Sequence, residues 1–434
     1  MSTVSLRAAD IAEIRSIMAN RVESGRAVSI VTGVIDEKQR QVIASGKISL
    51  DGAQQPDGDT VFEIGSVTKV FTSLILAGMI EKGEVKPDDA VAKFLPATVK
   101  VPSRNGRQIT LLDLSMQVSG LPRMPDNFKP ADPANPYADY DAAKLYDFLS
   151  RYTLTRDPGE KYEYSNLAVG LLGHALALKA GISYEELLRR RIFDPLGMSS
   201  TSITLSEAQK KRLAPGYNAS LKPARNWDLD ALAGAGAVRS TVNDMLKFVA
   251  ANLELTDTPL KSAMRRMRSV TKEIGAPDLE IGMAWHVLTK FDTRIWWHNG
   301  GTAGYRSFVG FNPAKKEGVV VLCNTFMDND DLGRHVLESR YPVSTVQKYK
   351  EVPVDAAVLE RYVGEYEMTP ALKITVTRQG AQLFAQATSQ PRFEIFAQSE
   401  SEFFLKVVDA QITFLKDGLI LHQNGMDQKA KKVK

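Results

Sequence analysis

The sequence predicts an α+β protein with two parts: a first domain in which an antiparallel sheet carries an inserted helical block, and a small all-β barrel after it. Strand-like runs occur near the start of the chain and return at about 294–323, and a mostly helical pattern lies between them at about 66–250. Short alternating strands follow near the C-terminus, as in small barrels. If the early and late strands pair, both ends of the first domain contribute to one sheet. We place the two domains at 1–345 and 354–434.

The opening elements are a helix and a hairpin. Residues 8–24 carry apolar side chains at helical spacing, which predicts an amphipathic helix with one solvent-exposed face. The β-rich runs 28–35 and 41–45 flank the charged turn 36–39, which is typical of a hairpin.

The inserted block carries the start and stop signals of helices. Residues 110–113 match a capping box, the apolar run 167–179 is stopped by Gly181, and 184–192 predicts another helix. The loop 128–136 is punctuated by prolines, as in loops that rim a cleft.

The later strands suit antiparallel pairing. Runs at 294–298, 305–311 and 318–323 are separated by turn residues and predict a meander. Six short alternating runs between 372 and 422 predict a barrel or sandwich of roughly eighty residues, and they carry no catalytic pattern.

Composition excludes several classes of function. The chain has 434 residues, 44% hydrophobic and 24% charged, which indicates an ordinary globular protein, and its net charge of +4 is mild for this length. The basic cluster 265–268 lacks interleaved aromatic residues, so we interpret it as a solvated helix face and expect no nucleic-acid partner. The single cysteine, Cys323, excludes an intrachain disulfide and is expected in a core strand.

Motifs for metals, cofactors and membranes are also missing. The five histidines are scattered and form no HExxH-like pair, so we expect no metal and no cofactor, and neither a P-loop nor a G-x-S-x-G elbow occurs. No run reaches the roughly 18 apolar residues of a membrane span, and the first residues lack an apolar signal core. The chain as written is expected in the cytoplasm, or in the periplasm if a leader has been removed; its oligomeric state stays open.

The tetrapeptide SVTK occurs twice, at 66–69 and at 269–272. Ser-x-x-Lys can supply a nucleophile and its base, because residues three apart share one face of a helix. The second copy lies among charged residues before a Gly-Ala-Pro break, where its lysine is expected to be solvated. The first copy opens the apolar run 67–80, which predicts a buried helix.

Position therefore favours Ser66 and Lys69 as the reacting pair. A serine at a helix N-terminus lies near free N–H groups that stabilise developing negative charge. Burial lowers the pKa of a lysine toward a value useful for proton transfer. The alternative for this pair is an N-cap serine with a lysine that extends to solvent.

Two further motifs follow in the chain. Tyr164 and Asn166 form its only Tyr-x-Asn, just before the apolar helix, and a partly ionised tyrosine there could act as a general base. His298 precedes Gly300 and Gly301, whose lack of side chains would let a substrate lie along the strand, with the Gly301 N–H as an oxyanion donor. Each residue alone is more often structural, so the evidence is their co-occurrence in this order.

The three motifs in this order resemble those of serine hydrolases grouped with class C β-lactamases, low-molecular-mass penicillin-binding proteins and family VIII carboxylesterases. The resemblance runs from about residue 10 to 340 and includes the stretches 111–122 and 235–241. It implies the β-lactamase/transpeptidase fold. The segment from about 354 onward resembles the lipocalin-like barrels appended to some of these hydrolases.

The resemblance also implies roles for the residues. Ser66 would be acylated by an amide or ester carbonyl, Lys69 and Tyr164 would manage its proton, and water would release the acyl group. Asn166 would bind the substrate amide, and the N–H groups of Ser66 and Gly301 would hold the oxyanion.

One departure bears on the substrate. Class C β-lactamases carry Lys-Thr-Gly where this chain has His298-Asn299-Gly300, and a histidine is only partly charged near neutral pH, so we expect weaker recognition of anions. The expected partner is a small-molecule substrate: a β-lactam, a small ester or a D-amino-acid peptide. The open alternatives are β-lactamase or esterase, D-amino-acid peptidase or carboxypeptidase, and a penicillin-binding sensor with little turnover.

Overall fold

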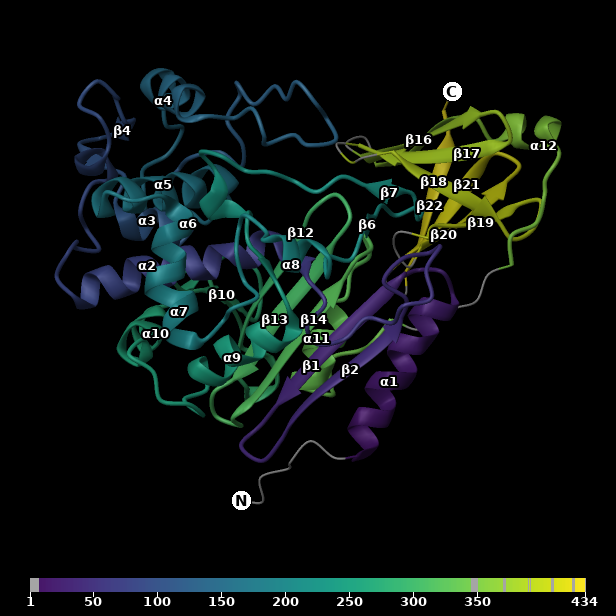
Figure 1. The fold of residues 1–434 in the computed structure, drawn as a ribbon. Coiled ribbons are helices and arrows are strands. Elements are labelled where there is room, and N and C mark those ends of the chain that lie inside the picture. The colour runs from purple at the N-terminus through teal and green to yellow at the C-terminus, as the bar shows by residue number, and fades with distance from the viewer. Residues whose placement is uncertain are drawn as a thin grey trace.

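A computed structural model describes residues 8–344, 350–369, 372–388, 390, 392–406, 410–423 and 426–433. Figure 1 shows a large body of helices around a sheet, with a barrel at its upper right. Two neighbouring strands of the sheet come from opposite ends of the first 323 residues. The barrel, in contrast, is formed by the C-terminal strands alone.

The central sheet has eight strands in the order β2-β1-β14-β13-β12-β11-β10-β9. Strand β1 pairs antiparallel with β14, so that Ile30 lies opposite Cys323. This pairing confirms that both ends of the first domain share one sheet. The strands are β1 (Ser29–Ile35), β2 (Arg40–Gly46), β9 (Lys272–Glu273), β10 (Leu279–Ile281), β11 (His286–Leu288), β12 (Ile295–Gly301), β13 (Arg306–Asn312) and β14 (Glu317–Cys323).

Helices cover both faces of this sheet, which explains why β1 is buried along its whole length. Ile30 and Val34 face a cluster that includes residues of α1 (Ala8–Glu23) and α11 (Asp330–Leu337). Val31 and Ile35 alternate with them and belong to the larger core on the side of the helical block. A strand buried on both faces appears in the sequence as a continuous apolar run.

The inserted helical block follows the predicted signals closely. Thr110 and Asp113 form a reciprocal capping box, and Gly181 ends its helix with a φ of 70°, a backbone conformation that glycine adopts readily. The helix that begins at Tyr184 changes to π geometry after Leu188, a detail that the pattern did not indicate. The helices of the inserted block are α2 (Thr68–Glu81), α3 (Leu111–Ser115), α4 (Ala142–Arg151), α5 (Asn166–Ala180), α6 (Tyr184–Leu188), α7 (Asp194–Leu196), α8 (Glu207–Lys210), α9 (Val242–Asn252) and α10 (Lys261–Met267).

Short strand pairs complete this block and connect it to the reactive serine. Strand β3 ends three residues before Ser66 and pairs with β8, which comes just before α9. The pairs are β3 (Phe62–Glu63) with β8 (Arg239–Ser240), β4 (Ser103–Arg104) with β5 (Arg107–Gln108), and β6 (Gly216–Tyr217) with β7 (Pro223–Ala224). Within the described ranges, no single helix has the length and hydropathy to cross a membrane.

The C-terminal strands close into an eight-stranded antiparallel barrel after helix α12 (Ala356–Arg361), which confirms the predicted small barrel. The sequence patterns missed its first and last strands, the latter because it is mostly polar and charged. Side chains such as Tyr366, Phe403 and Phe414 fill the interior. The strands are β15 (Gly364–Thr369), β16 (Leu372–Gln379), β17 (Gln382–Ala387), β18 (Phe393–Ala397), β19 (Glu402–Phe404), β20 (Ala410–Leu415), β21 (Gly418–Gln423) and β22 (Met426–Lys432).

The barrel touches the first part of the chain through the β6–β7 turn. The Ser220 hydroxyl donates a hydrogen bond to the Glu394 carboxylate on β18, and Lys222 Nζ lies 3.9 Å from the same carboxylate. The domain boundary between 345 and 354 stays a prediction, and residues 345–349 lie outside the described residues.

Candidate active site

Ser66 lies in a tight turn that glycines allow to approach strand β12. The turn Gly65–Val67 is a 3-10 helix that leads directly into α2. A Cβ on Gly65, whose φ is +49°, would lie 2.8 Å from the Gly301 nitrogen, and a Cβ on Gly300 would lie 2.0 Å from the Ile64 carbonyl oxygen. Side chains at these two positions would push the strand away from the serine.

Lys69 lies one turn after Ser66, is completely buried, and has three oxygen neighbours. Its Nζ lies 3.0 Å from Ser66 Oγ, 2.8 Å from Asn166 Oδ1 and 2.7 Å from the Ala235 carbonyl oxygen. Burial holds the pKa of Lys69 well below its usual range, and the positive charge of Arg123 lowers it further. A neutral amine has two hydrogens and one lone pair, and the amide and carbonyl oxygens can only accept. In that neutral form only the serine hydroxyl could donate to the lone pair, whereas the ammonium form would donate to all three oxygens.

Tyr164 completes this group, but not in the ionisation state that we expected. Its hydroxyl shares a hydrogen bond with Ser66, and Lys69 Nζ lies 4.8 Å from its ring centroid. Burial raises the pKa of Tyr164, and this effect exceeds the lowering by the Ser66 hydrogen bond and by Arg123. The raised pKa argues against the partly ionised tyrosine that we expected and favours the neutral phenol in the resting site.

Asn166 is the first residue of α5, where the Ser165 side chain caps the helix. Its Oδ1 accepts from Lys69, and its Nδ2 lies 3.2 Å from the hydroxyl of Tyr137, to which it donates. The residue that the sequence suggested as a substrate ligand therefore also orients the lysine.

His298 is buried behind the tyrosine with a second histidine. Its ring centroid lies 6.2 Å from that of Tyr164 and 5.2 Å from that of His286, and its Nδ1 lies 2.6 Å from the Asn299 carbonyl oxygen. Burial holds the pKa of His298 well below its ordinary value, with smaller lowering by His286 and Lys69. The expected partial charge is therefore corrected to a neutral ring.

The end of β12 presents a free edge to the serine. Strand β11 pairs with β12 only as far as the His286–Trp297 pair, so residues 298–301 continue without a neighbour on that side. A free strand edge offers N–H and C=O groups to an extended substrate. Gly301 lies at this edge next to the turn that carries Ser66.

The second SVTK copy does not form a Ser-Lys pair. Helix α10 ends before Ser269, whose hydroxyl donates to the Arg266 carbonyl at 2.9 Å, and Lys272 lies in β9 with its Nζ donating to the Gly159 carbonyl. The sequence-based choice of Ser66 thus agrees with the geometry.

Several residues around the serine were missed by sequence reasoning. A small pocket is lined by Ser66, Asn166 and Gly301 together with Tyr137, Trp227 and Ala235. The Tyr137 and Trp227 rings pack at 5.3 Å between centroids. Tyr137 follows the proline-rich loop that we expected to rim a cleft, and Ala235 begins the stretch 235–241 that carries part of the resemblance, but nothing in the sequence indicated Trp227.

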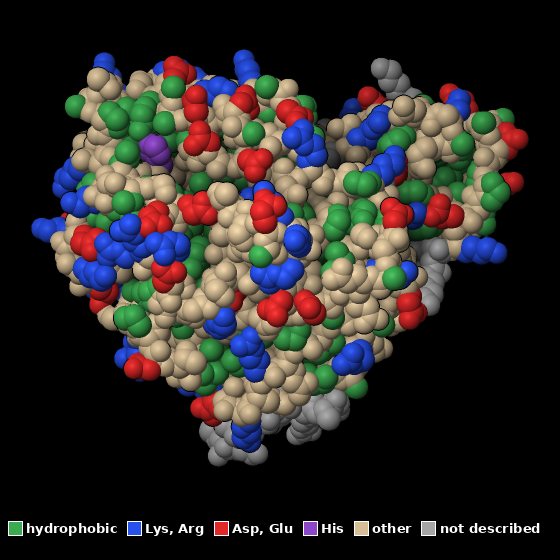
Figure 2. Space-filling view, in the orientation of Figure 1, with side chains coloured by type: hydrophobic (Ala, Val, Ile, Leu, Met, Phe, Trp, Pro, Cys, Tyr) green, Lys and Arg blue, Asp and Glu red, His purple; other side chains and the backbone are tan. Residues whose placement is uncertain are grey.

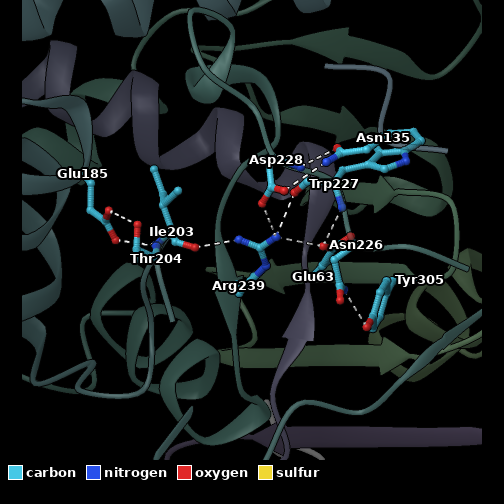
Figure 3. A network of polar contacts seen from close by, with 10 residues as sticks. All are labelled: Glu63, Asn135, Glu185, Ile203, Thr204, Asn226, Trp227, Asp228, Arg239 and Tyr305. Atoms are coloured by element: carbon cyan, nitrogen blue, oxygen red, sulfur yellow. Dashed lines mark hydrogen bonds and ion pairs between the residues drawn. The ribbon is translucent and has the colours of Figure 1, made fainter. Parts of the chain in front are cut away.

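A buried ion pair holds the Trp227 segment against the strand that leads to Ser66 (Figure 3). Arg239 on β8 donates to Glu63 on β3 at 3.2 Å and to the Trp227 carbonyl at 2.8 Å. Glu63 also accepts from the Trp227 N–H at 3.0 Å. Asp228 and Asn135 exchange two further hydrogen bonds, which tie the proline-rich loop to the same segment.

Across the described residues, no cluster of three His, Cys, Asp or Glu side chains could hold a metal ion. The charged side chains on the face shown in Figure 2 are mostly interleaved, positive with negative.

Two family models together match most of the chain. The Beta-lactamase family model matches residues 14–338, and a domain of unknown function, DUF3471, matches residues 348–426. The D-alanyl-D-alanine-carboxypeptidase/endopeptidase AmpH of Escherichia coli (strain K12) is 31% identical over 309 residues, which cover 68% of this chain and 79% of that protein. Penicillin-binding protein 4* of Bacillus subtilis (strain 168) is 25% identical over 414 residues, 87% of this chain and 88% of that protein.

A solved structure agrees in fold. The beta-lactamase/D-alanine carboxypeptidase from Yersinia pestis, crystallised with citrate, is 28% identical, with a TM-score of 0.64 over 73% of this chain and 93% of that one. The range matched by the family model, residues 14–338, contains the central sheet, the helical block and all three motifs.

Proposed function

The chain belongs to the Beta-lactamase family of serine hydrolases, and from this premise we propose that it hydrolyses small amides or esters through an acyl-enzyme on Ser66. The hydrogen-bonding arrangement of Lys69 carries the proposal. Its Nζ lies 3.0 Å from Ser66 Oγ and also contacts the oxygens of Asn166 and Ala235. In the neutral amine the two N–H groups bond to Asn166 and Ala235, and the lone pair is left to accept the Ser66 proton. This is the arrangement that a general base needs before attack.

In the first step, Lys69 takes the Ser66 proton while Oγ bonds to the substrate carbonyl carbon. The carbonyl oxygen gains negative charge, which the N–H groups of Ser66 and Gly301 stabilise. The bond to the leaving nitrogen or oxygen then breaks, and the neutral Tyr164 phenol supplies a proton to that atom while Lys69 restores it. Water then attacks the carbonyl carbon of the resulting ester. The bond to Ser66 Oγ breaks, Oγ takes back a proton, and the acyl group leaves as a carboxylic acid.

The substrate follows from the pocket and from the relatives. β-Lactams and small carboxylic esters both present a carbonyl that Ser66 can attack, and His298 with Gly300 would shape the strand edge on which they lie. A D-amino-acid carboxypeptidase is the second candidate, because the E. coli relative is named as one. A penicillin-binding sensor would share the first step but not the release of the acyl group.

The test is a time course of intact mass after mixing with a penicillin, with peptide mapping and drug consumption followed in parallel. An adduct on Ser66 that decays as drug is consumed supports turnover. A lasting adduct favours the peptidase or sensor, and esters and D-alanyl peptides are then assayed. Ser66→Ala should abolish turnover and Ser269→Ala should leave it nearly unchanged; equal losses would defeat the assignment of the nucleophile.

A further inference from the structure

The basic groups buried at the site are poor sources of positive charge. Burial lowers the pKa of Lys69, of His298 and of His286, the last to about 4. The lysine of Lys-Thr-Gly, which supplies a positive charge in class C β-lactamases, is here replaced by His298. An anionic substrate group would therefore need its positive charge from another element.

Arg123 is a full positive charge beside the reacting groups. Its guanidinium carbon lies 5.1 Å from the Tyr164 ring centroid, and Lys69 Nζ lies 4.8 Å from the same centroid. The Arg123 carbonyl accepts from the N–H groups of Asn166 at 3.0 Å and Leu167 at 3.4 Å, which fixes this loop to the start of α5. The residue itself is exposed, so its guanidinium is open to a ligand.

This guanidinium is not occupied by an acidic side chain. The acidic residues nearest to it along the motif-bearing segments, Asp126 and Glu163, pair with Arg151 and Arg156. Within the described ranges, Arg123 has neither a side-chain hydrogen bond nor an ion pair, and its ring contact with Tyr164 leaves its N–H groups unused. Guanidinium N–H groups match a carboxylate in pairs.

We propose that Arg123 binds a carboxylate of the substrate and makes the site selective for carboxylate-bearing substrates over neutral ones. The inference rests on the proposed acyl-enzyme function and names its substrate class. The carboxylate docks beside Tyr164, where Arg123 supplies the positive charge that the missing lysine would have given. Because the guanidinium is exposed, its effect is screened by salt.

Matched substrate pairs test this. A chromogenic cephalosporin with its free carboxylate is compared with its methyl ester, in wild type, Arg123→Gln and Arg123→Lys. The ratio of kcat/KM for acid over ester should fall about tenfold in Arg123→Gln, mainly through KM, and Arg123→Lys should restore part of it. The wild-type ratio should also fall as salt is raised. Arg265→Gln is the control, since Arg265 is an exposed arginine that pairs with Glu254, and it should leave the ratio unchanged.

The possible outcomes distinguish a failure of the Arg123 role from a failure of the proposed acyl-enzyme function. An unchanged ratio in Arg123→Gln, with Ser66 still acylated, overturns the role of Arg123 and leaves the proposed function intact. Equal losses on acid and ester would also overturn it, because a general effect on Lys69 would explain them. If the wild type consumes neither substrate and Ser66 carries no adduct, the proposed function itself fails.

Discussion

Replacing Asn166 with aspartate tests whether Lys69 works as a neutral base. The substitution is nearly isosteric, and it places a carboxylate at the atom that now lies 2.8 Å from Lys69 Nζ. An acidic residue in the first turn of α5 suits the helix N-terminus, so the variant should fold. The new charge favours the ammonium form of the lysine, which has no lone pair for Ser66.

The size of the effect follows from the distance. Two unit charges 2.8 Å apart attract by about 6 kcal/mol at an effective dielectric constant of about 20. If desolvation of the new carboxylate removes about half, roughly 3 kcal/mol remains, which raises the acid limb of the pH profile by about two pH units. At a pH on that limb, kcat/KM should fall about a hundredfold and recover as the pH rises.

The assay is kcat/KM against pH for a chromogenic ester or β-lactam, with Asn166→Ala as the matched control. The alanine variant removes the same substrate contact without adding charge, so its rate should fall while its acid limb stays near the wild-type position. An Asn166→Asp profile that is lower but not displaced would refute the neutral-lysine base.

Three further results are expected. Gly300→Ala should destabilise the fold by about 1–3 kcal/mol in urea unfolding, because its Cβ would lie 2.0 Å from a backbone oxygen; Gly78→Ala, in an open position on α2, should stabilise it, and the opposite order would contradict the close approach. Arg239→Met should cost about 3 kcal/mol by leaving Glu63 buried without its cation, and a calorimetric Tm equal to wild type would contradict this. Raising salt should move the acid limb of the wild-type profile to higher pH, because it screens the exposed arginine that lowers the pKa of Lys69; a limb independent of salt would count against that influence.

The secondary structure was largely predictable because it depends on local signals. Continuous apolar runs identified the strands that pair as β1 and β14, and Gly181 identified the end of α5. The first and last barrel strands were missed, since β22 (Met426–Lys432) is mostly polar and is held by its neighbours in a closed ring. Local pattern does not encode that closure.

The sequence by itself identified the candidate reacting groups, because Ser66, Lys69 and Tyr164 stand out by residue type, spacing and order. Only the tertiary structure decided their charge states and their neighbours. Burial is the main cause of the raised pKa of Tyr164 and of the lowered pKa of His298, and it arises from segments far apart in the chain. The contact of Arg123 with Tyr164 likewise depends on how its loop meets α5, which no local pattern specifies.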